Sequence, residues 1–343
     1  MKKYVALALL GILSILLVVV FSAHRYFHSP YDHLHTDKVF VIKRGECFRG
    51  ISNGLARAGV LRYPWFFNAV VSTAGFDLRS KAGQYLFHSS MTPLEILDAL
   101  TKGLVVAQCI TVPEGFTIEQ IGELLEKEGV ADKTAILEAS RDPQMLKAMK
   151  ISAYSMEGYL FPDSYHMYQG MPPENIVKAM VRRFREVMTP QIGERINEMG
   201  LSLHEVVTLA SIIEKETSLE TERPLVASVL MNRLKKAMPL QSDPTVIYCL
   251  EDFDGNLTRE HLDMPVLYNT YVFKGLPPGP IANPGLASIQ AVLYPAKTSY
   301  LYFVSRNDGS HEFSENIKKH DHAVSRYQKG RNSTRAARRL RSQ

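Results

Sequence analysis

The chain has 343 residues and carries 40 Lys and Arg against 35 Asp and Glu, a formal net charge of +5. Hydrophobic residues make up 45% and charged residues 22%, the usage of a chain that buries a core, which excludes disorder for most of its length. The positive charge is concentrated at the end: residues 329–343 hold six basic residues and no acidic one, and the rest sums to −1. A nucleic-acid-binding surface on the folded body is therefore not expected.

The N-terminus contains one long apolar segment. Residues 4–23 carry no charge, and twenty helical residues span roughly 30 Å, the thickness of a bilayer core. The alternative is a cleaved signal peptide, but its apolar region is usually about 7 to 15 residues, and Phe21-Ser22-Ala23 is a poor cleavage site. Because Lys2 and Lys3 precede the segment, the positive-inside rule predicts a cytosolic tip and anchor at residues 1–23, with the remainder outside the cytosol.

Cysteine and histidine usage does not predict a metal site. The three cysteines, Cys47, Cys109 and Cys249, are widely spaced and form no CxxC pair, which argues against both a disulfide framework and a zinc site. Residues 24–37 contain four histidines, but their spacing is irregular, so a solvated linker is the better interpretation than a metal site. No metal and no cofactor are expected.

Residues 40–60 and 110–130 resemble each other at an offset of seventy. The matches pair Gly45, Ile51, Leu55, Gly59 and Val60 with Gly115, Ile121, Leu125, Gly129 and Val130. Each copy predicts a short strand, a glycine turn, and an amphipathic helix that ends at a glycine with positive φ. Between the copies we expect a strand over 82–87 and a helix over 92–100 with Thr92 as N-cap. The pattern predicts a compact αβ module at residues 38–104.

The remainder to residue 328 is predicted to be a mostly helical α+β domain, residues 105–328. The helices are expected over 173–188, 203–217, 224–238, 287–294 and 315–328. Strands over 300–306 and 311–314 flank the turn-rich tetrapeptide 307–310, which predicts a hairpin. Residues 329–343 show no apolar periodicity and are predicted to be a disordered basic tail; attraction to an anionic envelope polymer is the alternative.

One glutamate on the helix over 203–217 is a candidate general acid. Ser202 and Glu205 have capping-box spacing, so the start of the helix is set and its faces follow from about 100° per residue. The predicted buried stripe comprises Leu203, Val206, Val207, Ala210 and Ile213. Glu214 falls on this stripe, where loss of water disfavours the charged form and favours the proton that a general acid must hold, whereas Glu216 lies roughly 160° around the helix. The alternative is a helix end at which Glu214 reaches solvent or pairs with a basic residue.

Several polar and aromatic residues cluster in stiff segments after this helix. The candidate substrate-binding residues are Gln241, Asp243, Tyr248, Tyr268, Asn269, Asn283 and Glu157. Asn283 belongs to residues 275–285, whose four prolines and three glycines exclude a helix or a central strand. Such a loop suits sugar binding, because aromatic faces stack on sugar rings and amides bind hydroxyl and N-acetyl groups; a purely structural loop is the alternative.

Five of these motifs together resemble the YceG-like endolytic murein transglycosylases. The motifs are EGYLFPDSY (157–165), LASIIEKET (209–217), LQSDPTVIY (240–248), YNTY (268–271) and GLPPGPIANPG (275–285). The resemblance extends from the N-terminal anchor to about residue 328. Two departures from the family pattern are Ser164, where many members have Thr, and His320-Asp321-His322, where members often carry Asn after the first His; neither affects the acid.

The resemblance implies a single-pass protein of the bacterial inner membrane with its catalytic domain in the periplasm. It further implies a LysM-like glycan-binding module at 38–104 and cleavage inside nascent peptidoglycan strands, with a peptidoglycan synthase as a candidate partner. The family's catalytic glutamate is the first Glu of EKET, which is Glu214 here. The implied reaction cuts the β-1,4 bond between N-acetylmuramic acid and N-acetylglucosamine without water and leaves a 1,6-anhydro end.

Two other functions remain open at this level. A hydrolase of the same bond would use Asp243 or Glu157 to activate water and would leave a product end heavier by one water. A non-catalytic wall-binding scaffold would use the module and the anchor, and would bind glycan without cutting it.

Overall fold

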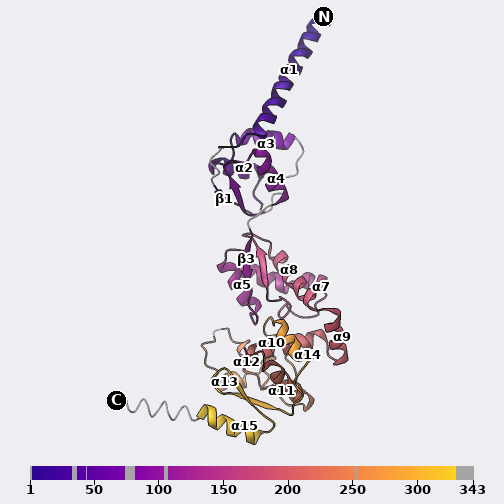
Figure 1. The fold of residues 1–343 in the computed structure, drawn as a ribbon, viewed down its shortest axis with the longest axis vertical. Helices are drawn as coiled ribbons and strands as arrows, with labels where there is room; N and C mark the ends of the chain where they lie inside the picture. The colour runs from indigo at the N-terminus through magenta and orange to yellow at the C-terminus, as the bar shows by residue number, and fades with distance from the viewer. Residues whose placement is uncertain are drawn as a thin grey trace, which may run out of the picture. The chain divides into compact units, whose positions relative to one another are not determined.

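The structure, a computed structural model, describes residues 2–32, 37–43, 45–73, 82–103, 107–251 and 253–329. The chain divides into two compact units (Figure 1). The first comprises residues up to Ile110 together with His166–Met171, and the second comprises Thr111–Tyr165 and the described residues from Pro172 onward. The basic tail beyond residue 329 and residues 33–36 of the predicted linker lie outside the described residues.

Helix α1 (Lys2–Phe27) contains the predicted membrane segment. Its stretch Leu9–Phe27 has a mean hydropathy of 1.9 and is long and apolar enough to cross a membrane, a test that a signal sequence also passes. The helix continues four residues past the predicted boundary at 23. Its last residue, Phe27, is 8% exposed and stacks on Phe67, with ring centroids 5.6 Å apart. Residues 24–27 are therefore helical, and Phe27 is part of the core of the first unit rather than a solvated linker.

The first unit is built on one pair of strands. Strand β1 (Asp37–Ile42) pairs antiparallel with β2 (Gly83–His88), in a register from Asp37 opposite His88 to Ile42 opposite Gly83. Helices α2 (Phe48–Arg57) and α3 (Pro64–Thr73) connect the strands, and α4 (Pro93–Lys102) follows. The fully buried side chains at the centre include Ile51, Leu55, Phe67, Tyr85, Phe87, Ile96 and Leu100. The order strand, helix, helix, strand, helix agrees with the predicted αβ module, although α3 was not predicted.

The glycines that mark the sequence repeat have the expected backbone. Gly59 and Gly129, which follow α2 and α5 (Ile118–Lys127), have φ of +72° and +69°. Gly45 and Gly115 have φ of +79° and +75°. Only glycine adopts this left-handed region at low cost, so these positions account for the shared pattern.

The second unit is mostly helical, with one strand pair wholly inside it. Besides α5, its helices are α6 (Lys133–Arg141), α7 (Pro143–Ala148), α8 (Pro173–Val187), α9 (Pro190–Glu198), α10 (Leu203–Glu216), α11 (Arg223–Lys235), α12 (Asp243–Ile247), α13 (Arg259–Asp263), α14 (Leu286–Leu293) and α15 (Ile317–Val324), continued by the π-helical turn η1 (Ser325–Lys329). Strand β5 (Tyr302–Ser305) pairs with β6 (His311–Ser314) in this unit. The division into units falls within β3 (Gln108–Thr111) and β4 (Ser164–Met167), which pair with each other. The mixed α+β class, the five predicted helices and the hairpin are confirmed within a few residues; α6, α7, α9, α12 and α13 were not predicted.

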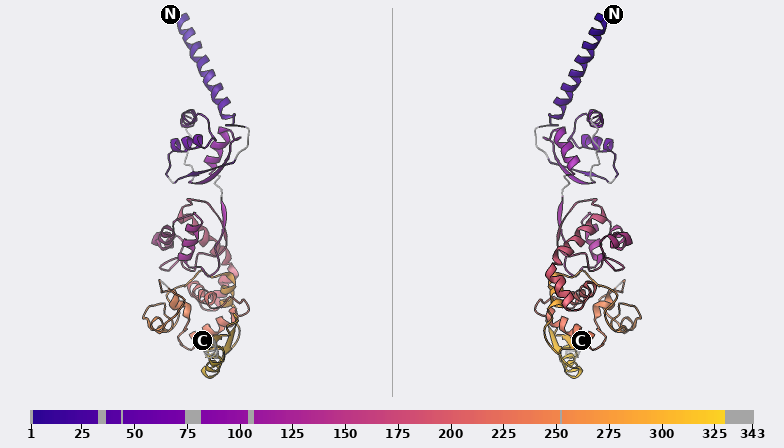
Figure 2. Two further views of the ribbon diagram at one scale, coloured as in Figure 1. Left: turned by 90° about the vertical axis from the view of Figure 1, so that its left-hand side faces the viewer. Right: turned by 90° about the vertical axis from the view of Figure 1, so that its right-hand side faces the viewer.

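Helix α10 forms the centre of this unit. It packs against α14 and α11 (Figure 1), and every residue from Val206 to Ile213 is buried. The burial therefore surrounds the helix instead of following one stripe, because loops as well as helices cover it. Helix α15 packs along the β5–β6 hairpin, as both side views show (Figure 2).

Candidate active site

The predicted capping box at the start of α10 is present. The Ser202 hydroxyl accepts a hydrogen bond from Glu205 N, and the Glu205 carboxylate accepts one from Ser202 N at 2.7 Å. The helix ends at Glu216, with Thr217 in an extended conformation. Glu214 therefore lies in the last turn, close to the segment that leads into α11.

The Glu214 carboxylate is buried and bonded on both oxygens. Its side chain is 6% exposed; Arg223 donates to Oε1 at 3.0 Å and the backbone N–H of Gly285 donates to Oε2 at 3.0 Å. Both contacts are polar, in contrast to the purely apolar surroundings expected from the helix phase. Pairing with a basic residue was the alternative interpretation, and the structure shows that pair, although away from solvent. Each oxygen keeps a second acceptor position for a proton or a ligand.

A second carboxylate lies beside Glu214. The Nη2 atom of Arg223 is 3.6 Å from Oε2 of Glu114, a residue in the turn before α5. Glu114 is 48% exposed at the side chain, whereas Arg223 is 8% exposed. Burial and the neighbouring Glu214 carboxylate raise the pKa of Glu114, and Arg223 opposes them. Sequence reasoning missed both Glu114 and Arg223.

Residues 275–285 hold the Gly285 amide against Glu214. No residue of this loop is helical or in a strand, as predicted, and Ile281 to Gly285 are buried. The backbone N–H of Ile281 donates to the Ser211 hydroxyl of α10 at 3.0 Å. The loop is thus fixed on the helix that carries the candidate acid, which is the structural role considered as its alternative.

The side chains of Glu157, Asn269 and Asn283 are internal. Glu157 is 5% exposed and the two asparagines are fully buried. Asn283 accepts from Leu160 N and donates to Phe116 O and to Glu157, so all of its polar atoms are bonded within the protein. These three side chains are thus enclosed by protein in this structure, and their direct contact with a sugar stays a prediction.

Glu157 anchors the start of α5. Both of its oxygens accept from Ile118 N at 3.2 Å, at the first helical residue, and one also accepts from the Tyr248 hydroxyl. Burial raises the pKa of Glu157 to about 7, against the effect of these hydrogen bonds. The Tyr248 ring lies 5.1 Å from that of Tyr268, and both tyrosines are partly exposed, so they remain available to a ligand.

Gln241 and Asp243 lie on the side of α10 that carries Glu216. With Glu216 and Arg233 they line a cavity of about 460 Å³. The Ser242 hydroxyl donates to the Glu216 carboxylate, and burial raises the pKa of Glu216 to about 7. Gln241 receives a hydrogen bond from Arg233, and Asp243 one from Tyr271. The candidate groove residues therefore separate into two groups, and Gln241 and Asp243 do not contact Glu214 in this structure.

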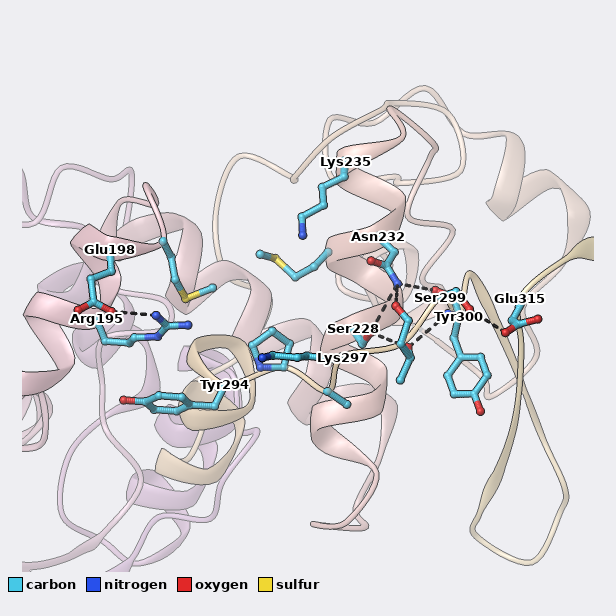
Figure 3. A pocket seen from close by; sticks show the side chains of 15 residues that line it. Arg195, Glu198, Ser228, Asn232, Lys235, Tyr294, Lys297, Ser299, Tyr300 and Glu315 are labelled. Atoms are coloured by element: carbon cyan, nitrogen blue, oxygen red, sulfur yellow. Dashed lines mark hydrogen bonds and ion pairs between the residues drawn. The ribbon is translucent and has the colours of Figure 1, made fainter.

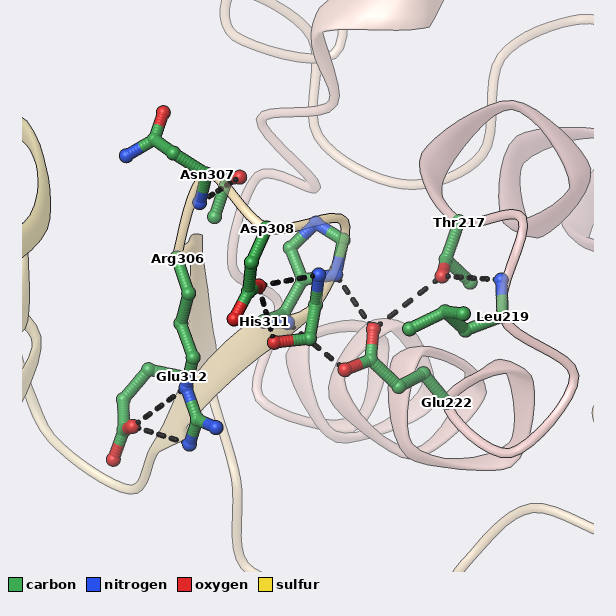
Figure 4. A network of polar contacts seen from close by, with 10 residues as sticks. Thr217, Leu219, Glu222, Arg306, Asn307, Asp308, His311 and Glu312 are labelled. Carbon is green, nitrogen blue, oxygen red and sulfur yellow. Dashed lines mark hydrogen bonds and ion pairs between the residues drawn. The ribbon is translucent and has the colours of Figure 1, made fainter.

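A buried polar network fixes the segment between α10 and α11 (Figure 4). Glu222 accepts from His311 N at 2.8 Å, its other oxygen lies 2.7 Å from His311 Nδ1, and Thr217 donates to it at 3.4 Å. Glu222 immediately precedes Arg223. The network thereby links the β5–β6 hairpin to the residue that pairs with Glu214.

A large hollow lies away from these carboxylates. A groove of about 1250 Å³ lies between α9, α11 and residues 294–300 (Figure 3), with the side chains of Lys235, Asn232 and Tyr294 along it. Asn232 is bonded to the Thr298 and Tyr300 carbonyls. Because Glu214 is not among its lining residues, volume alone does not locate the candidate chemistry.

Comparisons with known proteins identify the family. A model of the YceG-like family matches residues 40–326. An endolytic murein transglycosylase of Bacillus subtilis is 32% identical over 307 residues, covering 85% of each chain. A protein of the same name from Streptococcus pneumoniae is 29% identical over 321 residues, and the chain covers 57% of its length. The crystal structure of a putative YceG-like protein from Listeria monocytogenes matches with a TM-score of 0.59 and 31% identity, over 84% of this chain and 99% of that one. The chain belongs to the YceG-like family.

Proposed function

We propose that the chain is an endolytic murein transglycosylase, which cuts the β-1,4 bond between N-acetylmuramic acid and N-acetylglucosamine inside peptidoglycan strands. The observation that carries the proposal is a buried carboxylate, Glu214, held by Arg223 and the Gly285 amide at the end of the central helix. Relatives that align over most of this chain bear the name of that activity. No metal or cofactor is required by the chemistry proposed.

Glu214 alone can perform both proton transfers. In its protonated form it gives its proton to the glycosidic oxygen, and the bond from that oxygen to C1 of the muramyl residue breaks. The C6 hydroxyl of the same sugar then bonds to C1 and returns its proton to the Glu214 carboxylate. The 2-acetamido group of the substrate stabilises the positive charge at C1, so no second protein carboxylate is needed for that step. General acid and base catalysis of this kind contributes about 10² to 10⁴ in rate.

Sugar positioning is assigned to exposed or partly exposed groove residues. Tyr248 and Tyr268 offer adjacent rings, and Gln241 and Asp243 are accessible at a neighbouring cavity. Asn269, Asn283 and Glu157 support this surface from inside. Neither carboxylate suggested for a hydrolase is well placed to activate water. Glu157 is buried and accepts hydrogen bonds from three donors, and Asp243 accepts one from Tyr271.

Helix α1 and the first unit are assigned the task of holding the enzyme at the membrane and at its glycan substrate. We place α1 in the bacterial inner membrane with the N-terminus in the cytosol and the catalytic unit in the periplasm. The module at residues 38–104, from β1 to α4, is assigned LysM-like binding of glycan, and a peptidoglycan synthase is a candidate partner. A reporter fused after Gln343 should be active only outside the cytosol; activity in the cytosol contradicts this topology.

The reaction is tested by the ends of its products. The full chain in detergent is incubated with uncrosslinked glycan, and the products are analysed by mass spectrometry. A transglycosylase leaves 1,6-anhydro ends, a hydrolase leaves ends heavier by one water, and a scaffold leaves the strands uncut.

A further inference from the structure

The groove between α9, α11 and residues 294–300 has no part in the function proposed above, although it is built like a binding site (Figure 3). Its volume is about 1250 Å³, and hydrogen bonds tie its walls together. Ser228 and Asn232 of α11 bond residues 298–300, and Arg195 of α9 donates to the Leu293 carbonyl at 3.0 Å. The groove is therefore formed before any ligand arrives, as most ligand sites are.

The groove is positively charged once its ion pairs are taken into account. Both acidic side chains that line it are already paired, Glu198 with Arg195 at 2.8 Å and Glu315 with a lysine outside the groove at 3.1 Å. The two remaining cations, Lys235 and Lys297, have no ion-pair partner among the described residues. Both side chains point into the hollow (Figure 3). Two unpaired cations that face the same space attract an anionic ligand.

Apolar side chains supply the rest of the surface. Tyr294 is 62% exposed, and the Arg195 guanidinium lies over its ring, 5.2 Å from the centroid. Met199 and Met231 also line the groove, and methionine adapts its shape to varied apolar groups. A neutral glycan would leave the two lysines without partners, and a bare phosphate would leave the apolar surface uncovered. An acidic peptide with short apolar side chains satisfies both.

Two helices connect the groove with the candidate acid. Helix α11 begins at Arg223, which bonds Glu214, and ends at Lys235 in the groove. Helix α14 follows Gly285, the other partner of Glu214, and is followed by Tyr294. At 1.5 Å per residue these two stretches are roughly 13 to 18 Å long. An extended peptide of four or five residues reaches about 13 to 18 Å, so a chain attached to a sugar beside Glu214 is long enough to enter the groove.

We propose that this groove binds the acidic stem peptide of a murein strand, with Lys235 and Lys297 contacting its carboxylates and Tyr294 contacting its alanine methyl groups. This inference rests on the proposed function, which it extends from the glycan to the peptide that murein carries on its muramyl residues. Such stems combine alanine with residues that bear free carboxylates, the composition that the groove fits. A stem held there fixes the strand relative to Glu214, so the groove contributes to substrate affinity and not to the chemical step.

The direct test is the binding of a soluble stem pentapeptide to the full chain in detergent, measured by calorimetry. The double variant Lys235→Ala/Lys297→Ala should bind on the order of tenfold more weakly than wild type, since two exposed ion pairs are lost. A pentapeptide with amidated carboxylates should bind wild type just as weakly. Lys236→Ala removes an adjacent exposed lysine that does not line the groove, so it is the matched control and should keep the wild-type affinity.

Cleavage provides an independent readout. On strands that carry stems, the double variant should show a KM raised on the order of tenfold and a kcat near wild type. On the same strands after an amidase has removed the stems, the two proteins should have equal KM. Thermal unfolding shows whether the fold is retained.

The outcomes separate this inference from the proposed function. Equal affinity of wild type and the double variant for the pentapeptide, or a KM that rises equally on both kinds of strand, overturns the role of the groove. The proposed function fails in a different way: wild type then leaves no 1,6-anhydro ends on either kind of strand, whatever the pentapeptide does.

Discussion

The carboxylate of Glu114 fills the space in which a side chain of Gly285 would lie. A Cβ added to Gly285 would be 1.9 Å from Oε1 of Glu114, closer than two such atoms can approach. The φ of Gly285 is −75°, an ordinary value for any residue, so the backbone conformation does not demand glycine. Glycine is required here because Glu114 approaches too closely to leave room for a side chain.

Gly285→Ala should therefore displace Glu114 while keeping the amide that bonds Glu214. We expect a lower kcat, because Glu114 lies beside the candidate acid and shares its contact with Arg223. Gly193→Ala is the matched control, because a Cβ there meets nothing within 4 Å and the residue lies in α9. That change should leave cleavage intact and raise stability by up to about 1 kcal/mol. Wild-type kinetics in Gly285→Ala would show that the position of Glu114 is unimportant.

Stability should depend on pH through Glu216. Burial raises its pKa to about 7, above the ordinary value of 4.5, so the fold favours the protonated form. The contribution to stability is complete below about pH 4.5 and is lost as the pH rises through about 7. Glu216→Gln removes this loss, so its Tm should fall less than that of wild type between pH 5 and pH 8. The exposed Glu194→Gln should behave like wild type. Equal pH dependence in Glu216→Gln and wild type would refute the burial argument.

Glu157→Gln should reduce stability more than activity. The carboxylate accepts from Ile118 N, Asn283 and Tyr248, so an amide in its place turns an NH₂ group toward a donor. At pH 8, above the pKa of about 7, we expect a loss of about 1 to 3 kcal/mol in the free energy of unfolding by urea. Loss of cleavage at unchanged stability would instead indicate that Glu157 contacts the substrate directly.

The features predicted correctly are those with a local cause. The start of α10 follows from Ser202 and Glu205, three residues apart, and the ends of α2 and α5 follow from Gly59 and Gly129. Periodicity likewise located the long helices of the second unit. Short helices such as α6 and α7 were missed, because too few turns follow their N-caps, Asp132 and Asp142, for a helical period of apolar residues to show.

The surroundings of Glu214 could not be predicted from helix phase. Arg223 follows a turn, Gly285 is 71 residues away, and Glu114 precedes α10 by almost ninety residues, so only the tertiary fold brings them together. One sequence signal was present: Glu114 stands in the second copy of the repeat where the first copy has Arg44. A reversal of charge beside a matching glycine distinguishes the copy in the catalytic unit from the one in the module.

Deleting residues 38–104 tests the division of labour between the units. The module supplies most of β1 and all of α2, α3, β2 and α4, while Glu214 and its partners all belong to the second unit. We expect a folded deletion variant to cut glycan in solution but to lose control of product length in cells. Complete loss of cleavage, with the fold retained by circular dichroism, would mean that the module is part of the catalytic groove. An unchanged length distribution in cells would mean that it does not position the strand.

The most direct test of the central claim compares the products of wild type, Glu214→Gln and Glu216→Gln on uncrosslinked glycan. Glutamine at position 214 keeps the shape of the side chain but has no proton to donate, so 1,6-anhydro ends should appear with wild type and vanish with Glu214→Gln, while glycan binding and Tm are retained. Glu216→Gln, on the other side of α10, should have a much smaller effect. Anhydro ends from Glu214→Gln at the wild-type rate, with Glu216→Gln inactive, would contradict the assignment of the acid.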